Sequence, residues 1–183
     1  FQMLAQGNIE MMKEIGIKKI ITTCPHCYTT LKKDYAQLGG DFEVYHQGEF
    51  LAKLMSEGKL KVNPAIEGKV TFHDPCYLGR ANGIFEEPRG LVRKATKGSF
   101  EEMERNHNRS FCCGGGGGGM WMEEHHKRIN HARIDEAIAI QAGTVVTACP
   151  YCLIMMEDAI KDKEKVETMK AMDLSEFVMK GME

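Results

Sequence analysis

The spacing of five cysteines constrains this chain more than any other feature. Cys76, the adjacent pair Cys112 and Cys113, and the CxxC motif of Cys149 and Cys152 follow one another as C-x35-CC-x35-CxxC. Five thiols at two equal intervals meet at one point only if the chain folds back on itself twice. Closely set thiolates are the ligands that iron–sulfur clusters and zinc prefer. The spacing therefore predicts a metal centre built from segments that are distant in sequence.

A second, partial copy of this pattern lies upstream. Cys24-Pro-His-Cys27 is a CxxC motif with no matching partners before it. The two groups together account for all seven cysteines. Two thiols do not complete a four-ligand site, so the motif predicts a partial second site, with zinc or an iron–sulfur cluster as alternative occupants.

The sequence also contains an internal repeat. Residues 20–27 (IITTCPHC) correspond to residues 145–152 (VVTACPYC), and both are followed by a helical pattern, a strand candidate and a Glu-Phe-x-x-Lys segment. This order indicates a duplicated unit of about 125 residues. We expect one complete unit, roughly 59–183, and the carboxyl-terminal part of another at 1–58. Because the chain starts at Phe1, we expect it to be a piece of a longer protein.

Strand and helix patterns alternate along the complete unit. The sequence predicts strands at 69–73, 100–105, 144–148 and 166–169, helices at 86–96 and 120–142, and a strand at 42–46 in the first unit. The longest helix, 120–142, has an apolar face that includes Trp121, Ile134 and Ile138. The alternation predicts an α/β fold of repeated βαβ units, with mainly parallel sheets and two pseudo-repeats, the first truncated. Cysteines follow two strands directly, at the sheet edge where such folds bind ligands.

Six consecutive glycines, 114–119, follow the Cys-Cys pair. Two successive side chains normally diverge, so both reach one centre only on a tightly curved backbone. Glycine provides this curvature and allows backbone N–H groups to approach the sulfurs. A flexible surface loop is the alternative for the glycine run alone, but its position favours a cradle for the metal centre. A phosphate-binding P-loop is excluded because no Gly-Lys-Ser/Thr follows.

The number of thiols leaves the nature of the centre open. A cubane [4Fe–4S] cluster or a structural zinc takes four ligands, and five are present. An iron–sulfur centre is favoured over zinc, and both over metal-free dithiol chemistry. We expect ligation to stabilise the fold by on the order of 10 kcal/mol, by analogy with structural zinc. Loss of the metal should loosen the loops that carry Cys76, Cys112 and Cys113.

Composition limits the partners and the compartment. A net charge of −2 argues against a nucleic-acid surface. We expect no membrane span in this chain, because no apolar run approaches the roughly 20 residues that a span requires. Thiols in CxxC and CC groups without a secretion signal are typical of the reducing cytoplasm.

Other polar residues have competing interpretations. His73 is a candidate proton relay, but a strand-end histidine bonded to backbone is favoured. His26 is a candidate zinc ligand, although an exposed turn position is favoured. His125 and His126 are adjacent on the predicted helix and point to a solvated face. Arg80 is a candidate for steering an anion or stabilising cluster charge, with surface solvation equally favoured.

The motifs resemble one known family. The pattern C-x35-CC-x35-CxxC, with Cys112-Cys113-Gly114, resembles the CCG cysteine-rich domain of the B-type and D-type polypeptides of heterodisulfide reductase and of related iron–sulfur proteins. Residues 73–80 (HDPCYLGR) and 120–124 (MWMEE) are most similar to the D-type branch associated with electron-transfer flavoprotein. The resemblance implies a cytoplasmic oxidoreductase domain with a [4Fe–4S] cluster, cubane or non-cubane, for electron transfer.

The resemblance also implies ligands and partners. The implied ligands are the five cysteines of the complete motif (Cys76, Cys112, Cys113, Cys149 and Cys152), with Cys24 and Cys27 at a partial metal site. The implied partners are other redox subunits or domains, namely a flavoprotein or an iron–sulfur donor or acceptor. A link to membrane quinone would place the parent protein at the cytoplasmic face of a membrane. The alternative is a zinc-binding structural or docking module of a redox complex.

Overall fold

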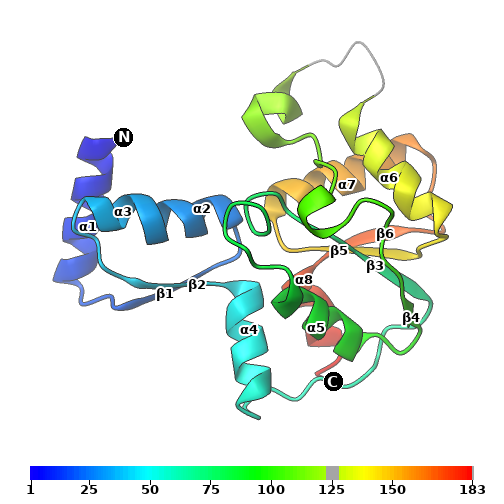
Figure 1. The fold of residues 1–183 in the computed structure, drawn as a ribbon, viewed down its shortest axis with the longest axis horizontal. Coiled ribbons are helices and arrows are strands. Elements are labelled where there is room, and N and C mark those ends of the chain that lie inside the picture. The colour runs from blue at the N-terminus through cyan, green and yellow to red at the C-terminus, as the bar shows by residue number, and fades with distance from the viewer. Residues whose placement is uncertain (123–127, 183) are drawn as a thin grey trace.

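The computed structural model describes residues 1–122 and 128–182. Two β-sheets, each made of parallel strands, pack against helices (Figure 1). The amino-terminal part contains a two-stranded sheet and its helices. In chain order these are α1 (Gln2–Glu14), β1 (Lys19–Thr22), α2 (Pro25–Thr29), a π-helical turn (Thr30–Asp34), α3 (Tyr35–Gln37), β2 (Glu43–His46) and α4 (Gln47–Ser56).

The rest of the chain forms a four-stranded sheet in the order β4-β3-β5-β6, with every pair parallel. Its strands are β3 (Lys69–His73), β4 (Ser99–Phe100), β5 (Thr144–Thr147) and β6 (Lys170–Asp173). Its α-helices are α5 (Glu86–Ala95), α6 (Ile129–Ala139), α7 (Pro150–Asp162) and α8 (Leu174–Lys180). Two 3-10 turns, His107–Arg109 and Gly116–Trp121, lie in the connections.

Helices cover both faces of the larger sheet. In Figure 1, α6 and α7 lie on one side, and α5 and α8 lie on the other, next to α4. All four residues of β5 are buried, as expected for a central parallel strand. Val145 packs with Ile134 and Met156 on one face, and Val146 packs with Leu91 and Phe177 on the other.

The predicted repeat is visible in the order of elements. Helix, strand, helix, strand and helix follow one another from α1 to α4, and again from α6 to α8. The strand pairs also match, since Thr22 lies opposite His46 and Thr147 lies opposite Asp173. The α/β fold with parallel sheets is therefore confirmed. The division into 1–58 and 59–183 stays a prediction, and one buried apolar cluster contains residues of both parts.

Three predicted elements were wrong in their extent. The helix predicted at 120–142 begins only at Ile129, and Trp121 is 83% exposed at the end of a 3-10 turn rather than on an apolar face. Gly117 and Gly118 have positive φ, which interrupts any helix there. The part of this prediction at 123–127, including the surface position expected for His125 and His126, lies outside the described residues.

The other two errors concern strands. Only Ser99 and Phe100 of the segment near 100–105 pair with β3, because the chain then turns Met103 into the core. The strand predicted at 166–169 is a turn, in which the Thr168 amide donates to the Lys165 carbonyl, and β6 begins at Lys170. Separately, none of the described helices is both long enough and apolar enough to cross a membrane.

Candidate metal centre

Three connections and the first turn of α7 bring the five cysteines to one edge of the larger sheet. Cys76 lies in the turn after β3, and Cys149 is the N-cap of α7 directly after β5. Cys152 lies in the first turn of α7. Cys112 and Cys113 follow the 3-10 turn at His107–Arg109. The predicted convergence at the carboxyl ends of the strands is therefore present in the structure.

Side-chain interactions connect the five thiols. Cys152 Sγ donates to Cys113 Sγ at 3.3 Å, and the thiol pairs Cys76–Cys112, Cys112–Cys113 and Cys149–Cys152 shift one another's pKa. The pKa of Cys112 is lowered chiefly because it accepts from Cys113 and Cys76. The pKa values of Cys76 and Cys152 are raised, first because they donate to neighbouring sulfurs and then because of burial. Sulfurs this close together can share one metal centre.

Backbone amides support the negative charge of these sulfurs. The Gly114 and Gly115 amides donate to Cys112 Sγ at 3.3 Å and to Cys113 Sγ at 3.4 Å. Gly114 has a φ of 88°, which a glycine adopts without strain. The expectation that the glycine run curves around the thiols and brings N–H groups to them is confirmed at these two positions.

The start of α7 also affects Cys149. Pro150 occupies the first helical position, where no N–H is needed, and the nearby backbone of Cys152 and Tyr151 helps to lower the pKa of Cys149. Hydrogen bonds, first of all from the Cys152 thiol, lower the pKa of Cys149 to about 7 against the opposing effect of burial. This thiol is therefore prepared to bind a metal as the thiolate.

A buried ion pair ties the cysteine loops together. Asp74, two residues before Cys76, accepts two hydrogen bonds from Arg89 of α5 at 2.6 and 2.8 Å. The same carboxylate accepts from the His107 amide at 2.9 Å, on the segment that leads to Cys112. Arg89 is fully buried and also donates to Glu102 at 2.7 Å. Asp74 thus fixes the two loops relative to α5.

His73 is held by a second buried arginine. Arg133 Nε of α6 donates to His73 Nδ1 at 2.9 Å, so the expectation that backbone satisfies this histidine was wrong. Burial, together with the charge of Arg133, lowers the pKa of His73 to about 3 and keeps the ring neutral. A ring nitrogen of His73 lies within 4.8 Å of Cys113 Sγ and Cys152 Sγ.

The partial motif lies beside the complete one. Cys24 is buried at the start of α2 and Cys27 is exposed. His26 is half-buried in α2 rather than on an exposed turn, and its Nδ1 is 3.7 Å from Cys24 Sγ. Its ring stacks on Tyr77 at 4.1 Å and meets Tyr151 edge-on at 5.6 Å. The two CxxC helices therefore face each other through aromatic side chains.

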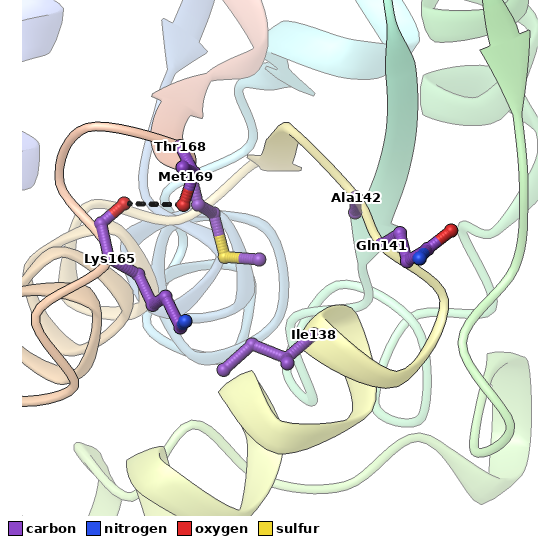
Figure 2. A pocket seen from close by; sticks show the side chains of 6 residues that line it. All are labelled: Ile138, Gln141, Ala142, Lys165, Thr168 and Met169. Atoms are coloured by element: carbon purple, nitrogen blue, oxygen red, sulfur yellow. Dashed lines mark hydrogen bonds between the residues drawn. The ribbon is translucent and has the colours of Figure 1, made fainter.

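Arg80 and two cavities complete the description of the surroundings. Arg80 is exposed. Its positive charge lowers the pKa of Cys76, but the effects that raise this pKa are larger. A cavity of about 290 Å³ lies next to the thiols, lined by His26, residues 115–118, Met120, Trp121 and Tyr151. The cavity of about 200 Å³ in Figure 2, where Ile138, Lys165 and Met169 face a common space, lies at the opposite edge of the sheet. It takes no part in the thiol site.

Sequence reasoning missed the buried arginines. Arg89 and Arg133 are completely buried. A signal was present for Arg133, because α6 buries Asn130, Arg133, Ile134 and Ala137, which have helical spacing. A charged residue in line with apolar core positions indicates a buried ion pair or hydrogen-bond partner.

Comparisons with known proteins identify the family of this chain. A family model for the CCG cysteine-rich domain matches residues 1–32 and 70–157. Over its whole length the chain is 44% identical to the EtfAB:quinone oxidoreductase of Syntrophomonas wolfei and 40% identical to the probable iron–sulfur-binding oxidoreductase FadF of Bacillus subtilis. Over 98% of its length it is 35% identical to the D polypeptide of the dihydromethanophenazine:CoB–CoM heterodisulfide reductase of Methanosarcina mazei. The chain spans 27%, 26% and 44% of these relatives, respectively.

Proposed function

This chain belongs to the CCG family of cysteine-rich domains, and from that premise we propose that it holds an iron–sulfur cluster of an oxidoreductase. The ligands are Cys76, Cys112, Cys113, Cys149 and Cys152. The observation that carries the proposal is the convergence of these five thiols, in which Cys152 Sγ lies 3.3 Å from Cys113 Sγ and the neighbouring thiols shift one another's pKa. When bound, the cluster supplies one-electron transfer. The chain contributes thiolates, N–H donors and a buried surrounding.

The composition of the donors fits this group. Five thiols with hydrogen-bonded sulfurs match the ligands of a [4Fe–4S] cluster, which needs four cysteines as a cubane. The fifth thiol is spare in a cubane and is employed in a non-cubane cluster. At Cys24 and Cys27 we propose a separate partial site, where zinc or iron completes its ligand set with residues from elsewhere.

The redox partners that we propose are based on the name of one relative. One relative is named EtfAB:quinone oxidoreductase. We propose on this basis that the protein containing this chain exchanges electrons with a flavoprotein and is linked to quinone, at the cytoplasmic face of a membrane. The thiol site and its adjacent cavity are where such electrons would enter or leave.

Metal analysis tests the proposal on protein purified without oxygen. We expect about four irons with matching acid-labile sulfide per chain. Cys112→Ser should change or abolish the cluster spectrum, whereas Cys27→Ser, at an exposed thiol outside the group of five, should retain it. An unchanged spectrum in Cys112→Ser contradicts the ligand assignment. About one zinc without sulfide favours the alternative, a structural module.

A further inference from the structure

We propose that His73 is a fixed hydrogen-bond donor to the sulfurs of the metal centre and that Arg133 holds it in this role. The identity of the metal rests on the function proposed above. The position of the proton on the His73 ring is independent of that function, because it follows from contacts between residues of this chain.

Arg133 determines which ring nitrogen carries the proton. Its Nε–H donates to His73 Nδ1 at 2.9 Å. A guanidinium group has only donors and stays protonated in proteins. Nδ1 must therefore present a lone pair, and the proton of the neutral ring must lie on Nε2.

Arg133 cannot turn away from this contact. Its side chain is fully buried, and its Nη1 donates to the Arg105 carbonyl at 2.8 Å and to Glu136 at 2.5 Å. Its Nη2 lies 3.5 Å from Ser110 Oγ. These bonds attach Arg133 to the segment before the Cys-Cys pair, so the ring orientation is fixed by the same elements that position the thiols.

The remaining nitrogen of His73 is unpaired beside the thiol site. Among the described residues, His73 Nε2 is buried without a hydrogen-bond partner. A ring nitrogen of His73, Cys113 Sγ and Cys152 Sγ lie within 4.8 Å of one another. Since Nδ1 is engaged by Arg133, Nε2–H is the group available to these sulfurs. An unpaired buried N–H is costly, and a sulfur acceptor removes that cost.

The same contact excludes the obvious alternative role. One histidine and two cysteines resemble a zinc ligand set. Ligation through Nε2 requires a lone pair there and moves the proton to Nδ1. That proton would point at the Nε–H of Arg133, and two donors would face each other in a buried site. His73 therefore donates and does not ligate.

A donor at this position has a consequence for electron transfer. Reduction adds negative charge to a cluster, and hydrogen bonds to its sulfurs stabilise that charge and raise the potential. His73 thus makes the centre easier to reduce, and Arg133 is the residue that positions it.

Pulsed paramagnetic resonance on the intact protein with 15N-labelled histidine tests this inference. We expect a weak nitrogen coupling and an exchangeable proton, both lost in His73→Leu. A strong coupling, as from a nitrogen ligand, overturns the inference, and so does the absence of any coupling. If neither the reduced nor the oxidised protein contains a paramagnetic centre, the proposed function fails. Nuclear magnetic resonance of the ring then locates the proton, and a proton on Nδ1 overturns the inference.

Midpoint potentials of two variants add an independent measurement. His73→Leu removes the donor, and we expect a more negative midpoint potential with iron content retained. His73→Gln offers an amide donor and should remain closer to the unsubstituted protein. Equal shifts in both variants overturn the donor role. If neither variant retains iron, the resonance measurement on the unsubstituted protein decides.

Discussion

At the scale of single residues, the site depends on charges that solvent does not reach. Arg89 is fully buried between Asp74 and Glu102, and its guanidinium lies over the Phe72 ring at 5.3 Å. A buried pair contributes little compared with well-packed apolar residues, but removal of one partner leaves the other charge uncompensated. The ion pair therefore makes the arrangement of the loops sensitive to single substitutions.

We expect Arg89→Met to lower the free energy of unfolding by about 3–5 kcal/mol, because it leaves Asp74 buried without its counter-ion. Urea unfolding monitored by circular dichroism measures the change. Arg93→Met is the matched control, one turn along α5. Its side chain is 51% exposed, and its nearest carboxylate contacts are 3.6 and 3.7 Å. We expect a change within about 0.5 kcal/mol there. Equal losses in both variants would contradict the importance of the buried pair.

The cysteines of the site could be predicted from the sequence because they form a spaced motif. The buried residues that surround them could not be predicted. Cysteine spacing specifies Cys76, Cys112 and Cys149 as a group because few other roles suit thiols in this pattern. The contact between Arg133 and His73 joins residues 60 positions apart. Sequence alone does not reveal it, because α6 brings the two together only after docking on the sheet.

At the scale of elements, the glycine run is a shaped loop rather than a flexible linker. Gly114 has positive φ, and a Cβ there would lie 3.2 Å from the Ile129 Cβ. At Gly119 a Cβ would lie 2.4 Å from the Gly114 carbonyl oxygen. Gly116, between them, has open space and no positive φ. The need for glycine therefore differs sharply along the run.

Alanine substitutions in the glycine loop should separate these positions. Gly114→Ala should cost about 1–2 kcal/mol of stability from backbone strain and should reduce cluster retention, because the Gly114 amide would leave Cys112 Sγ. Gly116→Ala should leave both properties unchanged. Urea unfolding and iron content after gel filtration measure the two effects. Similar iron content in the two variants would indicate that the loop does not cradle the thiols.

The cap of α4 predicts a pH dependence. His46 Nδ1 accepts from the Gly48 amide at 3.1 Å, and Nε2 lies 3.2 Å from the Thr23 carbonyl. Burial lowers the pKa of His46 below its usual value of about 6.5. The unfolded state then binds the proton first, so this stability is complete above pH of about 6.5 and is lost as the pH falls through the folded pKa.

His46→Asn tests this effect. Asparagine can cap α4 but does not titrate. We expect the variant to lose less stability than the unsubstituted protein between pH of about 7 and 5. The pH dependence should not vanish, because His73 contributes in the same direction. Urea unfolding at several pH values measures the slope. Identical slopes would show that His46 does not change its protonation on unfolding in this range.

Strands could be predicted where side chains alone determine burial. Residues 69–73 and 144–147 are β-branched or aromatic runs, and both form central strands. The helix predicted at 120–142 failed because its apolar periodicity continued across a segment that follows six glycines. Trp121 instead ends a 3-10 turn in which Gly117 and Gly118 have positive φ, and hydrophobic patterning does not record this backbone conformation.

At the scale of the whole molecule, the repeat could be predicted from the sequence, but the docking of its two parts could not. The matching CxxC helices α2 and α7 present His26 and Tyr151 at equivalent positions of the motif, and these rings meet. Asp173 at the end of β6 accepts from Gln47 at 3.0 Å, and thus links α8 to α4. Such contacts depend on how the two parts pack, which no local pattern encodes.

Two amides of the glycine loop donate to cysteine sulfurs, and this predicts a local response to metal removal. Anaerobic chelation should speed hydrogen exchange at the Gly114 and Gly115 amides, which donate to sulfurs, and in the turn around Cys76. The amides of β2 should exchange as before, because they pair with β1 and do not donate to a sulfur. Mass spectrometry of peptides covering 74–83, 110–122 and 43–50 measures the response. If hydrogen exchange became faster by the same factor in all three peptides, the metal would stabilise the whole fold. Unchanged exchange in the first two would show that protein contacts alone order these loops.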